Sequence, residues 1–473
     1  MRKLFTIISI TTLISILVSC KNEITGDIII TNTNVIDIEN LATIGNQTIA
    51  IENGSIKSIT PFSKSDNYNS VIVVDGTDKF IIPSLWDMHV HYATSREHPN
   101  FRKLFIANGI LGVRDLWGNL EVRDSLVASN SMMPRIFLSG EIMDGPFSLL
   151  QGSIKPKSAD DAIRIVDSLH NEGADFIKVY DDLTKEIYIT IANRCNELKF
   201  PFVGHTPNDM TALEASELGQ KSIEHLNGIF ESASSEQKKI DSLESAFKEF
   251  FLQRDIPNAI GAFTSIGKMY SSNYDENELI KLSNVLKENE TYITPTLITH
   301  YHQWYRKDKS ISSNESLKYI PKQMLESWNP QNEFPTQLFD EETWDSGKEK
   351  VTTAKKITER LNREDVKLLA GTDCGNFYIV PGFSLHDELE LMVNSGMSTG
   401  QALKTATINP VTFFKMTDSL GTVAEKKIAD LVLLNGNPLE NIKETKNIYG
   451  VIKGGKYLDR EKLDKLLKES ETE

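Results

Sequence analysis

The sequence predicts an α/β protein: a (β/α)8 TIM-like barrel with a small β-sandwich domain built from both chain ends. Two observations predict this fold. In the middle of the chain, strand-like apolar runs alternate with amphipathic helical stretches, a pattern typical of parallel α/β proteins. Toward both ends, short β-rich runs are separated by Asn-Gly and Gly-Gly turns, which are typical of hairpins.

Eight apolar runs in the central region are the candidate barrel strands, and eight favour a barrel over an open sheet. In order they are FIIPSLWDMHVH, GILGVRDL, RIFLSG, ADFIKVYD, PFVGHT, SIEHL, TYITPTL and KLLAGTD. Helix-rich segments at about residues 230–290 and 302–360 follow the sixth and seventh runs. Both would lie above the C-terminal face of the barrel, where barrels keep their active sites.

The two chain ends predict strands of one small domain. Near the N-terminus these are DIIITNTNVID, NQTIAIENGSIKSIT and SVIVVDG, and near the C-terminus they are ADLVLLNGNP and NIYGVIKGGKYL. We therefore expect four segments: a signal peptide at 1–19, the N-terminal part of a β-sandwich domain at 20–83, the (β/α)8 barrel at 84–415 and the C-terminal part of the β-sandwich domain at 416–473.

Composition limits the possible partners. The chain has 473 residues, 40% of them hydrophobic and 25% charged, which is ordinary for a globular protein. Its formal net charge is −15, and it has no basic stripe and no glycine-rich phosphate loop. Because nucleic-acid binding needs a basic surface, we expect no nucleic-acid partner. A small-molecule substrate is expected instead, and an oligomer is possible.

The first twenty residues predict export. Arg2 and Lys3 precede an apolar stretch at residues 4–18, which is shorter than a membrane-spanning helix needs. Leu17-Val18-Ser19-Cys20 resembles the lipobox of bacterial lipoproteins. The resemblance implies cleavage before Cys20 and a lipid anchor on its thiol, which places the protein in the cell envelope, outside the cytoplasm, at a periplasmic or outer surface. The alternatives are an ordinary signal peptide or an uncleaved anchor.

Five residues of metal-ligand type stand at the ends of predicted strands. His89 and His91 form an H-x-H pair, so strand alternation puts both imidazoles on one face. His205, His225 and Asp373 end the fifth, sixth and eighth runs. A barrel brings these ends together at its mouth, and nitrogen and oxygen donors suit a divalent metal such as zinc.

The motifs DMHVH, GVRDL, FIKVY, GHT, EHL and GTD, with PGFSLHDELELMVNSGMSTGQALKTATINP and GTVAEKKIADLVLLNGNPLENI, resemble the metal-dependent amidohydrolase superfamily, in its imidazolonepropionase-like and prolidase-like branch. The resemblance extends over the mature chain. It implies that the barrel at 84–415 is a metal-dependent hydrolase of carbon–nitrogen bonds in an amide, a cyclic amide or a peptide-like substrate. The loop SGEIMDGPFSLLQGS lacks the Gly/His-rich stretch of many prolidase-like relatives, so the resemblance does not single out a dipeptidase.

The resemblance also implies a ligand set for two metal ions, with two Zn²⁺ as the expected cofactors. Related sites also accept iron, manganese or cobalt. His89, His91 and Asp373 would hold one ion, and His205 and His225 the other. Lys178 in FIKVY would be carboxylated by carbon dioxide and bridge both ions, because an ammonium group beside two cations would be repelled. The alternative is an ordinary lysine beside a single metal.

In the expected mechanism, a metal-bound hydroxide attacks the substrate, and Asp373 is the general base and then the general acid. Arg114 in GVRD is a candidate for binding a substrate carboxylate, or alternatively for a salt bridge with an acid such as Asp115. Tyr180 and His300 are further candidates for substrate binding. We expect His386 to be structural and Cys374 to point away from the barrel mouth.

Two other functions remain open at this stage. One is a mononuclear metal-dependent deaminase, which would not need Lys178 as a bridging ligand. The other is a surface lipoprotein without catalytic activity whose barrel binds a ligand. The full set of ligand-type residues favours the hydrolase.

Overall fold

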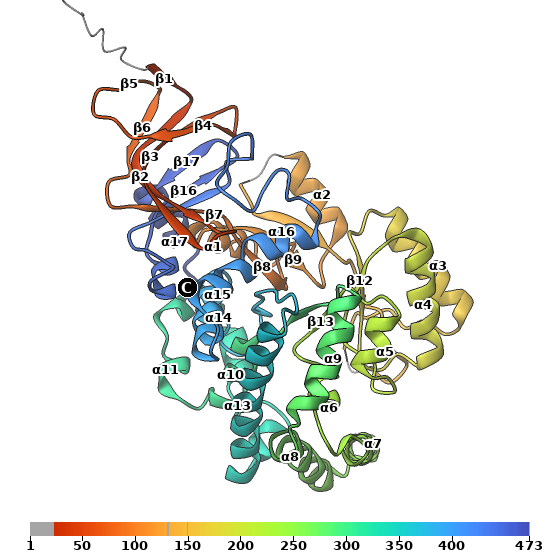
Figure 1. The fold of residues 1–473 in the computed structure, drawn as a ribbon. Coiled ribbons are helices and arrows are strands. Elements are labelled where there is room, and N and C mark those ends of the chain that lie inside the picture. The colour runs from red at the N-terminus through yellow and green to blue at the C-terminus, as the bar shows by residue number, and fades with distance from the viewer. Residues whose placement is uncertain (1–22, 130–131, 149, 473) are drawn as a thin grey trace, which may run out of the picture.

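The computed structural model describes residues 23–472 apart from 130, 131 and 149. The predicted signal peptide (1–19) and the predicted lipidation at Cys20 lie outside these residues. Strands from both chain ends form one end of the molecule, and the helices α7 and α8 form the opposite end (Figure 1). A body of parallel strands and helices lies between them.

The strands from the two chain ends pair in a single mixed sheet. Its eight strands follow the order β17-β16-β15-β7-β2-β3-β4, with β6 beside β2. The junction between the two ends is the antiparallel pair β15–β7, in which Val432 lies opposite Ile82. The members are β2 (Ile28–Asp37), β3 (Ala42–Glu52), β4 (Ser55–Pro61), β6 (Ile72–Asp75), β7 (Phe80–Pro83), β15 (Leu431–Leu434), β16 (Ile448–Lys453) and β17 (Lys456–Asp459).

This pairing confirms that both ends contribute to one β-structure, whereas a two-sheet sandwich is not established. Two further short strands near the N-terminus, β1 (Glu23–Thr25) and β5 (Asn67–Asn69), form a separate two-stranded sheet. The predicted domain boundaries stay a prediction.

Both faces of this sheet are covered where it meets the body. Leu431 and Leu433 of β15 pack in a hydrophobic cluster with other strands of this sheet. Val432 and Leu434 point the other way and belong to the main core of the body. A strand buried on both faces needs a continuous apolar sequence, because alternate side chains point to opposite faces. This explains why the run ADLVLLNG is apolar without a break.

Two parallel sheets form the centre of the body. One has the order β10-β9-β8, and the other has the order β11-β12-β13-β14. Seven of the eight predicted runs contain these strands: β8 (Leu85–Val90), β9 (Ile110–Asp115), β10 (Arg135–Leu138), β11 (Ile177–Val179), β12 (Phe202–Gly204), β13 (Ser222–Glu224) and β14 (Tyr292–Thr294). All of their pairings are parallel.

The eighth predicted run, residues 367–373, forms no ladder strand and lies between β14 and β8. Isolated parallel bridges join Leu368 to Ile293 and Cys374 to Val90. A further bridge joins Met143 to Val179, between the two parallel sheets. Within the residues that the structure describes, the regular ladders therefore do not close into a continuous barrel, and the architecture they establish is mixed α/β.

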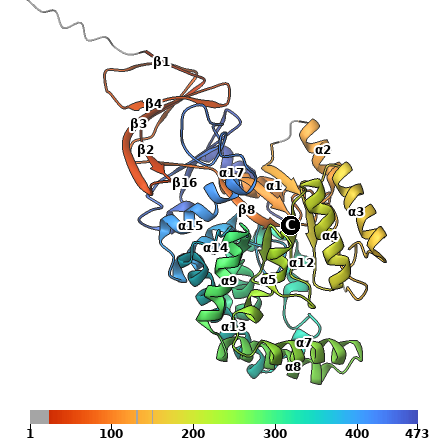
Figure 2. The same cartoon turned by 45° about the vertical axis from the view of Figure 1, so that its right-hand side comes forward.

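Helices cover the parallel strands from outside. Figure 2 shows α3 and α4 on one side of the body, and α13, α14 and α15 on the other. The covering helices are α1 (Phe101–Ala107), α2 (Leu120–Ala128), α3 (Ala159–Asn171), α4 (Lys185–Leu198), α5 (Ala212–Glu217), α14 (Phe383–Asn394), α15 (Thr399–Thr405) and α16 (Ile408–Phe413). The last helix, α17 (Arg460–Lys468), packs against α1, β16 and β17 instead.

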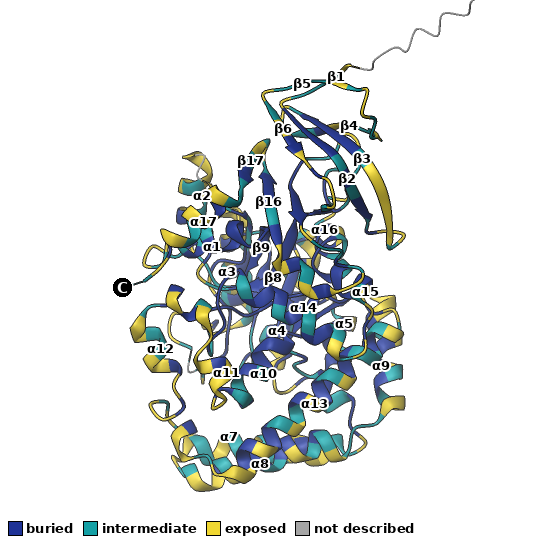
Figure 3. Cartoon of the chain, turned by 90° about the vertical axis from the view of Figure 1, so that its left-hand side faces the viewer, coloured by how far each residue is buried: buried dark blue, intermediate teal, exposed yellow. Residues whose placement is uncertain are grey.

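Both predicted helix-rich insertions are confirmed. The first follows β13 and contains α6 (Ile229–Ser232), α7 (Gln237–Leu252), α8 (Ile256–Ser272) and α9 (Glu276–Glu288). The second follows β14 and contains α10 (Leu297–Tyr305), α11 (Lys309–Ser312), α12 (Lys322–Trp328) and α13 (Glu341–Arg363), with the 3-10 turns η1 (Glu315–Tyr319) and η2 (Thr336–Leu338); a third turn, η3 (Ile442–Lys446), precedes β16. The central strands are buried, whereas α7 carries many exposed residues (Figure 3).

None of the helices among the described residues has the length and apolarity that crossing a membrane requires. The two cysteines in this part of the chain, Cys195 and Cys374, are both buried and free. The fold therefore rests on its apolar core, as the low cysteine count predicts.

The pairing of the two chain ends generates a stability prediction. Leu433 is fully buried and lies opposite Ile81 across the junction, whereas Val71 is 95% exposed. We expect Leu433→Ala to lower the free energy of unfolding by about 2–5 kcal/mol, because it leaves a cavity in a packed core. The control Val71→Ala should change it by less than about 0.5 kcal/mol. Urea denaturation measures both, and equal effects would contradict the packing described.

Candidate metal centre

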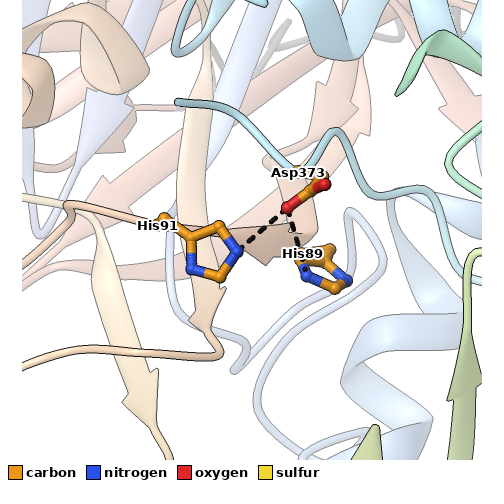
Figure 4. Close-up of side chains that lie close together, drawn as sticks. All are labelled: His89, His91 and Asp373. Carbon is orange, nitrogen blue, oxygen red and sulfur yellow. Dashed lines mark ion pairs between the residues drawn. The ribbon is translucent and has the colours of Figure 1, made fainter. Parts of the chain in front are cut away.

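Three predicted ligands meet at the C-terminal ends of strands (Figure 4). His89 belongs to β8, His91 follows it, and Asp373 ends the eighth run. Asp373 Oδ1 lies 2.9 Å from His91 Nε2 and 3.4 Å from His89 Nε2. One ligand atom from each residue lies within 4.8 Å of the others, which is compatible with a single ion bound by all three.

Close backbone packing holds Asp373 against β8. The Asp373 backbone N–H donates to the His89 carbonyl at 2.7 Å, and the φ of Asp373 is +55°, in the left-handed region. Two residues earlier, a Cβ on Gly371 would lie 2.8 Å from the His89 Cβ and 2.6 Å from the Thr294 side chain. Only glycine allows this approach, which explains the Gly in the AGTD motif.

The Asp87 carboxylate ties the eighth run to β8. Its Oδ1 accepts from the Thr372 N–H at 3.0 Å and the His89 N–H at 3.3 Å, and its Oδ2 accepts from the Thr372 hydroxyl at 2.7 Å. Burial raises the pKa of Asp87 to about 7, despite these hydrogen bonds. Asp87 was not among the predicted site residues, although it begins the DMHVH motif.

His205 and His225 lie beside the same group. The His225 ring centroid lies 4.5 Å from that of His89 and 5.1 Å from that of His205. His225 follows β13 with a φ of +58°. Strand alternation would point His225 away from the face of Glu224. Because His225 has a left-handed backbone conformation, the side chains of both Glu224 and His225 reach the site.

Lys178 of β11 is 1% exposed, and its Nζ has no hydrogen-bond partner among the described residues. Burial lowers the pKa of Lys178 to about 8, against the raising effect of Glu224 and Asp373. A buried ammonium without a partner is costly, so this position favours a neutral or modified amine.

Three of the four histidines use Nδ1 for a hydrogen bond within the protein. The partners are Glu224 Oε2 for His89 at 2.9 Å, Asp181 Oδ1 for His205 at 2.8 Å and Thr296 Oγ1 for His225 at 2.7 Å. Such partners hold a metal-binding imidazole by one nitrogen and leave the other for the ion. Sequence reasoning missed all three, although Glu224 directly precedes His225 and Asp181 and Thr296 follow the ends of their strands.

The donor set fits a divalent metal. Burial, foremost, lowers the pKa of His89 to about 4 and that of His225 well below its usual value, so both are neutral at neutral pH. For Asp373, burial raises the pKa, but His89, His225 and His91 outweigh it and keep this carboxyl ionised. Neutral imidazoles and an ionised carboxylate are the forms that bind metal. In addition, His91 Nδ1, His205 Nε2 and Lys178 Nζ are buried and have no hydrogen-bond partner within the part of the chain that the structure describes.

Arg114 is placed differently from the expected substrate-binding role. It is fully buried and donates from Nε to the Met88 carbonyl at 2.6 Å, from Nη1 to Ser222 Oγ at 2.7 Å and from Nη2 to Glu224 Oε1 at 2.7 Å. This placement favours the salt-bridge alternative. The partner acid is Glu224 on β13, rather than its neighbour Asp115.

Tyr180 and His300 both lie next to the histidines. The Tyr180 ring stacks on His205 with centroids 4.0 Å apart, and Tyr180 is partly exposed. His300 is buried and its Nε2 donates to the His225 carbonyl at 2.9 Å, so it supports the backbone of that residue. Burial lowers the pKa of His300 to about 3.

His386 and Cys374 are both buried. His386 is buried, with Nδ1 near Thr445 Oγ1 and Nε2 near the Asn108 carbonyl, which suits the expected structural role. Cys374 is buried, and burial raises the pKa of its thiol, so it is not a reactive thiolate.

Comparison with known families finds one match, over part of the chain. Residues 268–458 match the model of the Amidohydrolase family. This segment begins in α8 and includes Asp373, but it does not reach the His89–His91 pair, so only part of the ligand set is covered. No curated protein sequence matches the chain.

Several solved structures share the fold over most of both chains. Bottromycin amidohydrolase superposes with a TM-score of 0.70 at 21% identity, covering 93% of this chain and 90% of that one. A Xaa-Pro dipeptidase with bound methionine gives 0.65 at 19% identity, covering 91% and 99%. Ochratoxinase from A. niger gives 0.61 at 17% identity, covering 91% and 95%. The family model thus matches the C-terminal part of the chain, and these solved structures share its fold.

Glu388 on α14 gives a pH-dependent prediction for the helix that carries His300. Its carboxyl accepts from the Leu297 and Ile298 N–H groups at 3.0 and 2.7 Å, at the start of α10. Burial raises the pKa of Glu388 from 4.5 to about 8 despite these hydrogen bonds. Between these pH values the folded chain keeps a proton that the unfolded chain releases, so this group's contribution to stability falls as the pH rises.

Glu388→Gln removes that contribution, so its stability relative to the parent protein should improve steadily from pH 5 to pH 8. Urea midpoints measured at several pH values check this. A stability difference that stays constant over this range would contradict the raised pKa of Glu388.

Proposed function

We propose that this protein is a metal-dependent amidohydrolase that hydrolyses an amide, cyclic amide or peptide-like bond in a small-molecule substrate. The observation that carries the proposal is the cluster of His89, His91 and Asp373, in a fold shared with hydrolases of carbon–nitrogen bonds. Five residues of ligand type, from runs far apart in the sequence, gather at the ends of neighbouring strands.

The parallel strands form a (β/α)8 barrel in this proposal. The isolated bridges support it. Leu368 of the eighth run pairs with Ile293 of β14, Cys374 just after that run pairs with Val90 of β8, and Met143, in the segment after β10, pairs with Val179 of β11. In a barrel the C-terminal strand ends form the mouth, and the five residues of ligand type lie at such ends.

His89, His91 and Asp373 would hold one ion, and His205 and His225 a second. Zn²⁺ suits these nitrogen and oxygen donors. Lys178, carboxylated by carbon dioxide, would supply an oxygen ligand to both ions. Its lowered pKa supports this, since only the neutral amine reacts with carbon dioxide. The absence of a hydrogen-bond partner for its Nζ supports it too. When bound, such ions polarise a carbonyl and lower the pKa of a coordinated water to about 7.

Asp373 carries the proton in this mechanism. Its carboxylate is ionised and lies beside His89 and His91, so it can accept a proton from the attacking water. The water oxygen bonds to the carbonyl carbon, the carbon–nitrogen bond breaks, and Asp373 returns the proton to the leaving nitrogen. The products are a carboxylic acid and an amine, or the opened form of a ring. Tyr180, beside His205, is placed to contact the substrate.

One observation favours the mononuclear deaminase as a second candidate. Among the described residues, His89, His91 and Asp373 are the one group of three close enough to hold an ion together, whereas His205 and His225 provide only two ligands. A single metal at the first group would leave Lys178 as an ordinary lysine. Metal content therefore separates the two candidates.

Metal content per chain tests the proposal, measured by elemental analysis on protein purified without chelator and loaded with zinc and bicarbonate. We expect about two ions per chain for the parent protein and about one or fewer for Lys178→Ala, because the bridging ligand is lost. The control is Lys453→Ala. It removes a mostly buried lysine of β16, in the sheet formed by both chain ends, where Lys453 pairs with Asp430. It should leave metal content unchanged.

One ion per chain, unchanged in Lys178→Ala, would contradict the binuclear site and favour the deaminase. No ion in the parent protein would contradict both enzymes and favour the ligand-binding lipoprotein. With two ions present, a screen of N-acyl amino acids, dipeptides and cyclic amides should find activity that the chelator-treated protein lacks.

We also propose attachment to the membrane through a lipid on Cys20, at a periplasmic or outer surface of the cell envelope. The support is the sequence alone: a charged start, a short apolar stretch and Leu17-Val18-Ser19-Cys20.

Cys20→Ser should move the full-length protein from the membrane fraction to the soluble fraction, because the lipid provides the membrane affinity. Cell fractionation with immunoblotting measures this, and Cys195→Ser is the matched control. Membrane attachment that survives Cys20→Ser would contradict the lipid anchor and favour the uncleaved apolar stretch.

A further inference from the structure

Two consecutive hydrogen bonds join three buried polar side chains, from three strands, behind the metal centre. Arg114 of β9 donates to Glu224 of β13, and Glu224 Oε2 lies 2.9 Å from Nδ1 of His89 on β8. The three side chains are 1% exposed or less. The proposed mechanism gives His89 a part as a metal ligand, but it gives none to Arg114 or Glu224.

The hydrogen bond to Glu224 fixes which His89 nitrogen carries the proton. An ionised carboxylate only accepts hydrogen bonds, so Nδ1 bears the hydrogen when Glu224 is charged. Nε2 is then left with its lone pair, and it is the nitrogen that lies 3.4 Å from Asp373 Oδ1. The same contact limits rotation of the ring about its two side-chain bonds.

Arg114 makes the charge on Glu224 tolerable in the interior. A buried carboxylate without compensation is expensive. Glu224 Oε1 receives the Arg114 Nη2 hydrogen at 2.7 Å and a hydrogen bond from the Ser222 hydroxyl. Arg114 also donates to Met88, Ser222 and Thr294, and its guanidinium lies 5.1 Å from the centroid of the Phe413 ring. Arg114 is thus fixed by hydrogen bonds to β8, β13 and β14, with its positive charge beside Glu224.

The other histidines of the centre lack an equivalent partner. His205 pairs with Asp181, whose side chain is 34% exposed, and His225 pairs with the neutral hydroxyl of Thr296. A partly exposed carboxylate is screened by water more than a fully buried one, and a hydroxyl holds no charge. Of these three hydrogen bonds, the one from His89 is therefore expected to be the strongest and the most directional.

We propose that Glu224 is a positioning residue for metal binding: its hydrogen bond to Nδ1 sets the orientation of His89, and Arg114 holds Glu224 in place through the buried ion pair. The inference rests on the proposed function in one respect, the presence of a metal at His89, His91 and Asp373. It assigns Arg114 and Glu224 a part in the function that a purely structural salt bridge would not have.

Zinc affinity tests this inference, measured by competition with a chromophoric chelator on the whole chain. We expect Glu224→Gln to weaken zinc binding by about 10–100-fold, the range typical for loss of such a partner. The control is Asp175→Asn. This change also breaks a largely buried pair, between Asp175 and Arg123 at 3.0 Å, at a place that contacts none of the proposed ligands. It should cost stability and leave zinc affinity unchanged.

A double variant separates positioning from stability. Glu224→Gln leaves the Arg114 charge buried without its partner, which lowers the melting temperature of the metal-free protein. Adding Arg114→Met removes that charge, so the double variant should regain melting temperature yet still bind zinc about 10–100-fold more weakly than the parent. A structural salt bridge predicts that melting temperature and zinc affinity recover together, and that result would overturn the inference.

The remaining outcomes are distinct. Should the parent protein bind zinc and Glu224→Gln bind it equally tightly, the inference fails and the proposed function stands. Should the parent protein bind no zinc, the proposed function fails first. The spectrum of the cobalt-substituted protein gives a second readout: we expect altered visible bands in Glu224→Gln and parent-like bands in Asp175→Asn, and unchanged bands in Glu224→Gln would count against the inference.

Discussion

The position of Asp373 against His89 depends on a segment that has no regular strand pairing. The eighth run makes only isolated bridges to its neighbours, yet it delivers the carboxylate shared by His89 and His91. Its place is set by the missing side chain of Gly371, by backbone hydrogen bonds to β8 and by the Asp87 carboxylate, which accepts from Thr372. The ligand geometry thus results from close packing and side-chain hydrogen bonds more than from sheet pairing.

Burial of charge is the second constraint on this structure. Two carboxylates, an arginine, a lysine and several imidazoles occupy a region from which water is nearly excluded, and each charged group would be costly alone. Most are compensated by each other: Arg114 by Glu224, Glu224 by His89, and Asp373 by His89 and His91. Lys178 is the exception, since its Nζ has no partner. An interior arranged in this way is more consistent with a metal centre than with a purely structural core.

The sequence predicted the outline of the site well and its supporting contacts poorly. Strand alternation and the ends of apolar runs were enough to bring His89, His91 and Asp373 together, because these rules depend on neighbouring residues. Arg114 was harder: its adjacent acid is Asp115, whereas its true partner, Glu224, comes from another strand. Similarly, His225 reaches the site through a left-handed backbone conformation, which strand periodicity does not predict. At the chain ends, periodicity predicted the strands, but whether they form one sheet or two depends on long-range pairing.

The central claim is that these residues form a metal centre, and a crystal structure of the zinc- and bicarbonate-treated protein, with anomalous data collected at the zinc edge, tests it most directly. The account predicts one anomalous peak within about 2.2 Å of His89 Nε2, His91 Nε2 and a carboxylate oxygen of Asp373, at ordinary zinc–ligand distances. It also predicts a second peak beside His205 and His225, with density for a carboxylated Lys178 between them. A map with no anomalous peak at His89, His91 and Asp373 would contradict the account.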